Sequence, residues 1–140
     1  MKRSKLSLVF LMMGVAGVGS AQPETAPPPR EKLTPAELLV GRWRLEKVDG
    51  RPVPPTAVEF LTFTAKGRVN FLVRSLSYPD EAISGSYKLN GKIIEFCPDP
   101  PAGPKTVERT LVVVTKTRLI TQERGPDRMR LIEYVRDEGR

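Results

Sequence analysis

Eight short segments of alternating apolar and polar residues follow one another along most of the chain. Each segment is rich in branched or aromatic residues and is bounded by glycine, proline, asparagine or other turn formers, which is typical of β-strands. Eight short strands at this spacing predict an all-β fold, either a barrel or a sandwich. The expected strands are residues 42–48, 58–64, 68–74, 82–89, 92–97, 106–115, 118–124 and 129–136.

The connections between these strands discriminate between the two architectures. The links after the second, fourth and sixth strands are tight, and one is Asn90-Gly91, a strong hairpin dipeptide because both residues tolerate positive φ. The links after the first, third and fifth strands are longer and contain proline. If each strand pairs with its neighbour in sequence, all the long links share one rim. A Greek-key sandwich would not predict this alternation, so we predict an eight-stranded antiparallel up-and-down barrel.

A short helical turn is predicted immediately before the first strand. Thr34 and Glu37 have the spacing of a capping box, and Pro35 takes the first helical position, where its missing N–H is not needed. Gly41 ends the turn, and Trp43, the only tryptophan, stands on the first strand. We expect the turn to close the barrel at the end where the tight links lie.

The first residues have the features of a secretory signal peptide with cleavage after Ala21. A basic start is followed by an apolar run that is shorter than the roughly 18–20 residues of a membrane span. We therefore expect export to the periplasm or the exterior, with no membrane span after signal removal. The predicted organisation is signal peptide 1–21, proline-rich linker 22–32, barrel domain 33–137 and tail 138–140.

Composition argues against several classes of function. Signal removal lowers the formal net charge from +7 to +4, because Lys2, Arg3 and Lys5 leave with no acidic residue. The remaining arginines alternate with apolar residues instead of forming a basic face, so no nucleic-acid partner is expected. The sequence has no histidine, which removes the usual general base and zinc ligand. Asp80 and Asp99 lack the ligand spacing of a calcium site. We expect no enzyme activity, no metal and no cofactor.

The fifth and sixth expected strands carry two unusual features. Ile93-Ile94 and residues 111–114 are apolar on both faces, so a homodimer partner or an envelope protein is a candidate cover for their outer side. Cys97, the only cysteine, cannot form an intrachain disulfide. Its apolar neighbours favour a buried position over pairing between chains or with a small thiol.

Gly41-x-Trp43, after a helical turn and before an up-and-down meander, resembles the lipocalin-like barrels, in particular small exported bacterial domains of that kind. The resemblance covers about residues 33–136. It implies that the tryptophan closes the narrow end of the barrel and packs against an arginine of the last strand region. Arg136 and Arg130 both fit that position, and the contact would be a cation–π interaction. The domain is shorter than a typical lipocalin, shows no clear second or third lipocalin motif and has no C-terminal helix.

An eight-stranded barrel either fills with its own side chains or holds one small ligand. The candidate inward-facing residues are bulky enough to fill a small barrel. They are Trp43, Leu45, Leu61, Phe63, Val69, Phe71, Val73, Tyr87, Leu89, Ile94, Phe96, Leu111, Val113, Leu119 and Leu131.

Two functions therefore stay open. The first is an exported barrel that binds a small hydrophobic or amphiphilic molecule, an anionic one included, and the second is a solid barrel that acts as a protein-interaction or envelope-maintenance module. An interior void of roughly a few hundred Å³ would favour the first. The candidate ligand-binding residues are the rim residues Arg51, Arg74, Tyr78, Lys105 and Arg128 together with Phe71 and Tyr87.

Overall fold

The computed structural model describes residues 26–102 and 105–139, so the signal-peptide prediction lies outside the described residues. The chain divides into two units at the boundary between Lys32 and Leu33. In the first unit, residues 26–32 are exposed and have no regular secondary structure. Within the described ranges, no helix is long and apolar enough to cross a membrane.

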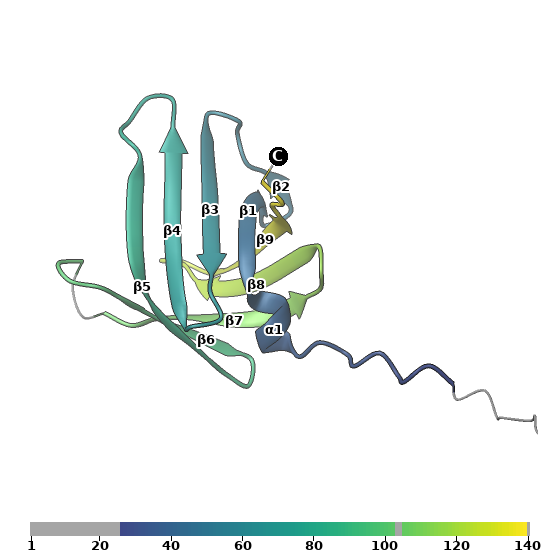
Figure 1. Ribbon diagram of the computed structural model, residues 1–140. Coiled ribbons are helices and arrows are strands. Elements are labelled where there is room, and N and C mark those ends of the chain that lie inside the picture. Colours follow the sequence, from purple (N-terminus) through teal and green to yellow (C-terminus); the bar gives the residue numbers. More distant parts are fainter. Residues whose placement is uncertain (1–25, 103–104, 140) are drawn as a thin grey trace, which may run out of the picture. The chain divides into compact units, whose positions relative to one another are not determined.

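The second unit is an antiparallel sheet closed into a barrel (Figure 1). Hydrogen bonds join β1 to β3 and then each strand to the next as far as β9, and pairing of β9 with β1 closes the ring. The expected eight-stranded up-and-down architecture is confirmed. The elements are α1 (Pro35–Leu39), β1 (Gly41–Val48), β2 (Arg51–Pro52), β3 (Ala57–Phe63), β4 (Arg68–Ser75), β5 (Glu81–Asn90), β6 (Ile93–Pro98), β7 (Val107–Val114), β8 (Arg118–Arg124) and β9 (Met129–Arg136).

The eight barrel strands begin and end within one residue of their expected positions. Two features were not expected. The two-residue strand β2 pairs with the end of β1 inside the first long link. Register shifts interrupt the β1–β9 pairing between Leu45 and Lys47 and the β7–β8 pairing between Leu111 and Val113. Such bulges change which side chains point inward, because the alternation of faces resumes out of phase after an inserted residue.

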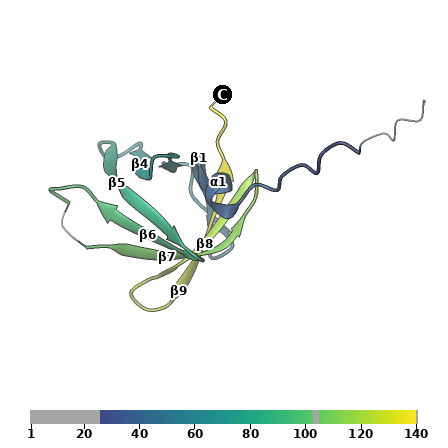
Figure 2. The same cartoon turned by 60° about the horizontal axis from the view of Figure 1, so that its bottom comes forward.

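The long and tight connections lie at opposite ends of the barrel, because consecutive strands are antiparallel neighbours. We call the end formed by the β1–β3, β4–β5, β6–β7 and β8–β9 connections the rim, and the opposite end the floor. Helix α1 lies at the floor, beside the start of β1 (Figures 1 and 2), and contacts β7. Its capping box is formed as expected: Glu37 N–H donates to Thr34 Oγ1, and Thr34 N–H donates to Glu37 Oε2.

The core follows the expected faces except at the end of β7, in β9 and at Cys97. Val113 is exposed and Val114 packs on the core instead, because the β7 bulge shifts the alternation. In β9 the alternation is unbroken, but Ile132 and Tyr134 are the buried residues, so Leu131 lies on the opposite face and its expected inward position is wrong. The burial expected for Cys97 is wrong as well: it is exposed, on the opposite face of β6 from the core residue Ile94. The buried core is Leu39, Trp43, Leu61, Phe63, Val69, Ile94, Leu111, Leu119, Ile132 and Tyr134.

Candidate functional site

The floor of the barrel is closed by Trp43. The side chain is fully buried, and its Nε1–H donates to the Leu39 carbonyl oxygen of α1 at 2.8 Å. The guanidinium carbon of Arg136 lies 4.1 Å from the centroid of the indole ring, which is a cation–π contact. Arg130, the other candidate, lies towards the rim end of β9 beside Gly125.

Arg136 also holds the helical turn against the barrel. Its Nη1 and Nη2 donate to the carbonyl oxygens of Val40 and Leu38 at 2.7 and 2.6 Å. Gly41 makes room for this arginine, because a Cβ at that position would lie 2.1 Å from Arg136 Nη1. The φ of Gly41 is +134°, a conformation that side-chain-bearing residues rarely adopt. The glycine, the tryptophan and the arginine therefore form one unit that seals the floor.

An apolar cavity of about 180 Å³ lies against the inner faces of β3 to β8. Eight of its ten lining residues are aliphatic or aromatic, so it offers a small molecule mainly hydrophobic contact. Phe71, one of the candidate ligand-binding residues, is part of the wall. The lining residues are Leu61, Phe63, Val69, Phe71, Ile83, Ile94, Phe96, Val107, Arg109 and Thr121.

The remaining candidates lie elsewhere. Tyr87 packs edge-on against Phe63 with ring centroids 4.8 Å apart, and its hydroxyl donates to the Thr64 carbonyl oxygen. The five rim candidates are exposed, and the structure does not bring them together around the cavity. Arg51 lies on β2, Tyr78 in the β4–β5 connection and Lys105 in the β6–β7 connection. Arg74 forms an ion pair with Asp80 at 3.4 Å, and Arg128 forms one with Asp49 at 3.0 Å.

A polar cluster, defined here as Glu59, Arg109, Glu123 and Tyr134, lies inside the barrel and reaches the cavity through Arg109. Arg109 Nε pairs with Glu123 Oε2 at 2.9 Å, and Arg109 Nη1 donates to the Tyr134 hydroxyl at 2.8 Å. The Tyr134 hydroxyl donates in turn to Glu59 Oε1 at 3.1 Å. Four strands, β3, β7, β8 and β9, supply one residue each.

Burial and the contacts within the cluster shift the pKa values of Glu59, Tyr134 and Arg109. Desolvation raises the pKa of the Glu59 carboxyl above its ordinary value, against the opposing effects of Tyr134 and Arg109. Burial likewise raises the pKa of the Tyr134 hydroxyl, which keeps it neutral. Burial by itself would lower the pKa of Arg109, but Tyr134 and Glu123 outweigh it and raise that pKa, so the guanidinium stays charged. The cluster therefore combines one fixed cation with two carboxyl groups.

Thr121 is the second polar residue of the cavity wall. Its side chain is fully buried, and its Oγ1 has no hydrogen-bond partner within the described part of the chain. A buried hydroxyl without a partner carries a desolvation penalty of about 1–3 kcal/mol. A ligand group that bonded to it would remove that penalty.

The polar cluster and Thr121 were not among the residues predicted from the sequence, although the strand alternation indicates that Arg109 and Glu59 point inward. Arg109 lies two residues before Leu111, and Glu59 lies two residues before Leu61. In a strand this spacing places both members of each pair on one face, and both leucines were expected to point inward. Each of these two strands therefore carries one charged residue on the same face as its core residues, and this pattern predicts a polar group inside the barrel.

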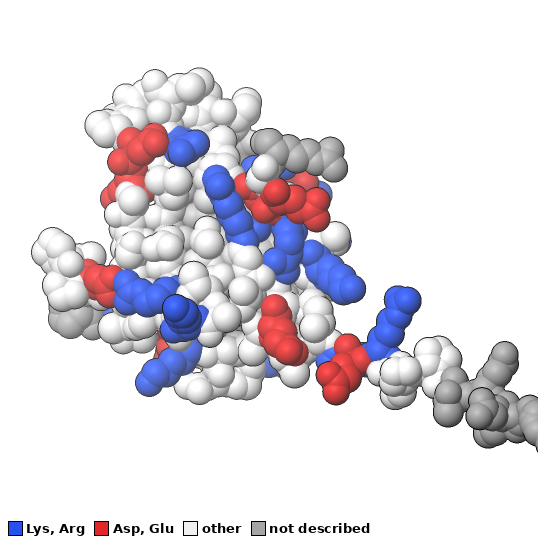
Figure 3. Space-filling model, viewed as in Figure 1, with Lys and Arg blue, Asp and Glu red and all other residues white. Residues whose placement is uncertain are grey.

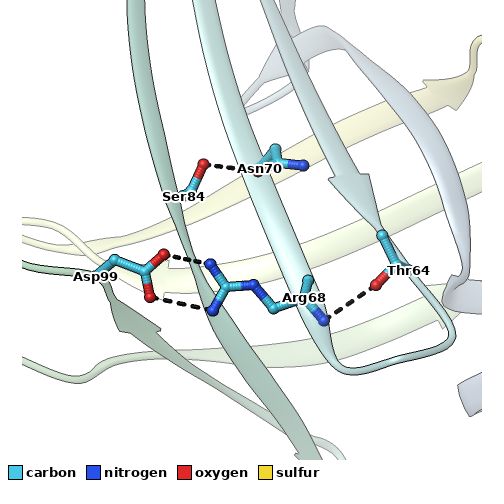
Figure 4. Close-up of polar contacts among 5 residues, drawn as sticks. All are labelled: Thr64, Arg68, Asn70, Ser84 and Asp99. Atoms are coloured by element: carbon cyan, nitrogen blue, oxygen red, sulfur yellow. Dashed lines mark hydrogen bonds and ion pairs between the residues drawn. The ribbon is translucent and has the colours of Figure 1, made fainter.

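The outer surface carries separate ion pairs. Arg68 Nη1 donates to Asp99 Oδ1 at 3.1 Å, and a second contact joins Arg68 Nη2 to the other carboxylate oxygen (Figure 4). The Arg68 guanidinium holds the pKa of Asp99 below its ordinary value. Acidic and basic side chains lie close together at several places on the face in Figure 3, and no single basic field dominates that face. In the described residues, no three acidic or cysteine side chains lie close enough to hold a metal ion.

The two stretches that are apolar on both faces are only partly exposed. Ile94 and Leu111 belong to the buried core. Val112 and Val113 are 47% and 38% exposed, so the outward apolar surface is confined mainly to these two valines.

The closed eight-stranded antiparallel barrel with one short helix is a lipocalin-like fold. It is similar to the crystal structure of a lipocalin-like protein from Bacteroides uniformis, with a TM-score of 0.58, 15% identity and coverage of 71% of this chain and 99% of that one. It is also similar to an uncharacterized protein from Bacteroides eggerthii, with a TM-score of 0.54, 16% identity and coverage of 71% and 99%. Identities this low show a shared fold. No protein-family model and no curated protein matches the sequence.

Proposed function

We propose that this chain is an exported lipocalin-like barrel that binds one small apolar or amphiphilic molecule in its interior cavity. The apolar cavity of about 180 Å³ carries the proposal. An apolar cavity of about 150 Å³ is large enough to bind benzene. Pockets for drug-sized ligands begin at about 300 Å³, so the proposed ligand is the size of one ring or a short chain.

The arrangement of the wall supports binding in preference to catalysis. The cavity residues are mainly apolar, Arg109 is held by partners, and the sequence offers no histidine as a general base. The proposed export depends on the signal-peptide pattern before Ala21. It is tested by the intact mass of the protein recovered from the host's periplasm and medium, for which Gln22 is the expected first residue.

The alternative function, a solid barrel that acts as an interaction or envelope-maintenance module, has a smaller basis in the structure. The exposed pair Val112 and Val113 supports it. The interior cavity argues against a solid barrel, although its volume of about 180 Å³ is smaller than the few hundred Å³ expected from the sequence for a ligand-binding barrel. Analytical ultracentrifugation tests the proposed homodimer, because Val112→Asp would then convert a dimer into a monomer.

Binding in the cavity is tested with the uncharged single-ring fluorescent dye 4-(dimethylamino)benzonitrile, which matches the size of the proposed ligand. Val107 lines the cavity and is 42% exposed, so Val107→Trp would fill the cavity without disturbing the buried core. Val112→Trp is the matched control, because Val112 stands on the same strand, is similarly exposed and does not line the cavity. We expect Val107→Trp to weaken dye binding at least about tenfold and the control to leave it unchanged. Absence of dye binding, or equal binding by both variants, would refute the proposal.

A further inference from the structure

The charged residues inside the barrel determine whether the cavity favours a charged or an uncharged ligand. Arg109 is the only charged residue on the cavity wall within the described residues. Its Nε pairs with Glu123 and its Nη1 with Tyr134, so each two-nitrogen edge of the guanidinium already has one nitrogen engaged. A carboxylate binds arginine most strongly through two parallel hydrogen bonds to one such edge. That mode is not open to a ligand here.

The charge around Arg109 also disfavours an anion. Glu123 contacts the guanidinium directly, and Glu59 is joined to it through the Tyr134 hydroxyl. The ion pair with Glu123 offsets the charge of Arg109, so the cluster has no net positive charge, and ionisation of Glu59 would make it net negative. A carboxylate entering the cavity would therefore lose its hydration without gaining a net positive partner.

Thr121 independently favours an uncharged polar group on the ligand. Its buried hydroxyl has no partner within the described chain, and the residue lines the same cavity as Arg109. A hydroxyl both donates and accepts, so it matches an uncharged alcohol or carbonyl group without adding charge. Apart from Arg109, the other wall residues are apolar and offer no second anchor.

We propose that the cavity selects uncharged ligands, with a small apolar body and a single hydroxyl or carbonyl group that hydrogen-bonds at Thr121 and Arg109, and that it discriminates against free carboxylates. This inference rests on the proposed function, because it names the ligand class for the same cavity. It narrows the sequence-based expectation, which included anionic ligands at the rim.

The test compares 1-octanol with octanoate at neutral pH, because the two differ mainly in the charge of the polar end. Each is titrated against the protein with bound 4-(dimethylamino)benzonitrile, and displacement of the dye is measured. We expect 1-octanol to bind at least about tenfold more tightly than octanoate. Equal displacement, stronger displacement by octanoate, or displacement by neither compound would each overturn the inference.

Two variants test the physical cause. Glu123→Gln removes a negative charge beside Arg109, so octanoate should gain affinity and the preference should narrow to about threefold or less. The matched control is Glu133→Gln, which breaks a 2.8 Å contact with Arg118 outside the polar cluster and should leave the preference unchanged. Thr121→Val should weaken 1-octanol binding severalfold and leave octanoate binding unaffected. An unchanged preference in both Glu123→Gln and Thr121→Val would overturn the inference.

The outcomes separate this inference from the proposed function. A dye that binds wild type but not Val107→Trp establishes binding in the cavity, whichever octyl compound displaces it. If the dye does not bind the wild type at all, the proposed function fails and the inference fails with it. If the dye binds and octanoate competes better than 1-octanol, only the inference fails.

Discussion

The guanidinium carbon of Arg136 lies over the buried ring of Trp43, 4.1 Å from the ring centroid, while its Nη atoms donate to the carbonyl oxygens of Leu38 and Val40 at the end of α1. The contact joins the last strand to the first strand and to the helical turn before it. It therefore closes the floor and fastens the seam between β1 and β9 at the same point.

Arg136→Lys tests this seal. Lysine keeps the charge but cannot stack as a planar group, and its single nitrogen cannot replace the three that bond the carbonyl oxygens of Leu38, Val40 and Lys116. We therefore expect a loss of about 1–3 kcal/mol in the free energy of unfolding. The free energy of unfolding is measured by urea titration with Trp43 fluorescence as the signal. Arg130→Lys is the control and should change stability by less than about 0.5 kcal/mol, because Arg130 is exposed. Equal effects of the two substitutions would contradict the assignment.

Gly41→Ala should be more harmful than an alanine at another positive-φ glycine. Its Cβ would collide with Arg136 Nη1, whereas a Cβ at Gly91, which has φ +62°, meets nothing within 4 Å. We expect Gly91→Ala to cost about 1 kcal/mol for backbone conformation alone and Gly41→Ala at least about 2 kcal/mol, because the displaced arginine adds to that cost. Chemical denaturation measures the free energy of unfolding of both variants. Equal losses of stability would show that the Arg136 side chain can move away without cost.

Thr121→Val should stabilise the empty protein. The substitution removes a buried hydroxyl without a partner and preserves the shape of the side chain, so the gain is about 1 kcal/mol. Thr115→Val is the contrast, because Thr115 Oγ1 accepts from the backbone N–H groups of Thr117 and Arg118 and its loss should destabilise. Thermal unfolding of ligand-free protein measures both. A destabilised Thr121→Val protein would show that the hydroxyl has a partner in solution, such as a bound water.

Glu59→Gln should change how stability depends on pH. Burial raises the pKa of Glu59 in the folded state above the ordinary value of 4.5, so the folded state binds this proton more tightly than the unfolded state. The contribution of Glu59 to stability therefore falls as pH rises from 4.5 through the raised pKa. Glutamine does not titrate, so the variant should gain stability relative to wild type across this interval and hold a constant difference above it.

Glu37→Gln provides the control of opposite sign for that experiment. Hydrogen bonds from Thr34 lower the pKa of Glu37 in the folded state, so its contribution is present above 4.5 and is lost as pH falls through the lowered value. Relative to wild type, Glu37→Gln should be less stable at neutral pH and equal to it in acid. Urea titrations at a series of pH values measure both variants. The same slope for both would contradict the burial of Glu59.

Much of the fold could be predicted because its signals are local. The apolar alternation located all eight barrel strands to within one residue, and Thr34 and Glu37 located the capped turn. Which side chains of a strand face inward was less predictable where a bulge interrupts the alternation. In β7 the register shift exposes Val113 and turns Val114 to the core, and no local property of these two valines distinguishes them.

The candidate site was largely beyond sequence reasoning, because its residues meet only when the barrel closes. Tyr134 and Glu59 are 75 residues apart in sequence, and Arg109 and Tyr134 are 25 apart. The rim cations were predicted to bind a ligand because they are charged and lie near long loops. In the structure, Arg74 and Arg128 instead form ion pairs with Asp80 and Asp49 at the surface.

The sequence by itself determined the order, extent and antiparallel course of the strands, because hairpin turns and a two-residue period act over a few neighbouring residues. Only the tertiary structure decided that Arg136 covers Trp43, that four distant strands place one cation among two carboxyl groups, and that an apolar cavity stays unfilled. These features depend on how the ring closes and on the volume left between side chains, and both are properties of the whole barrel.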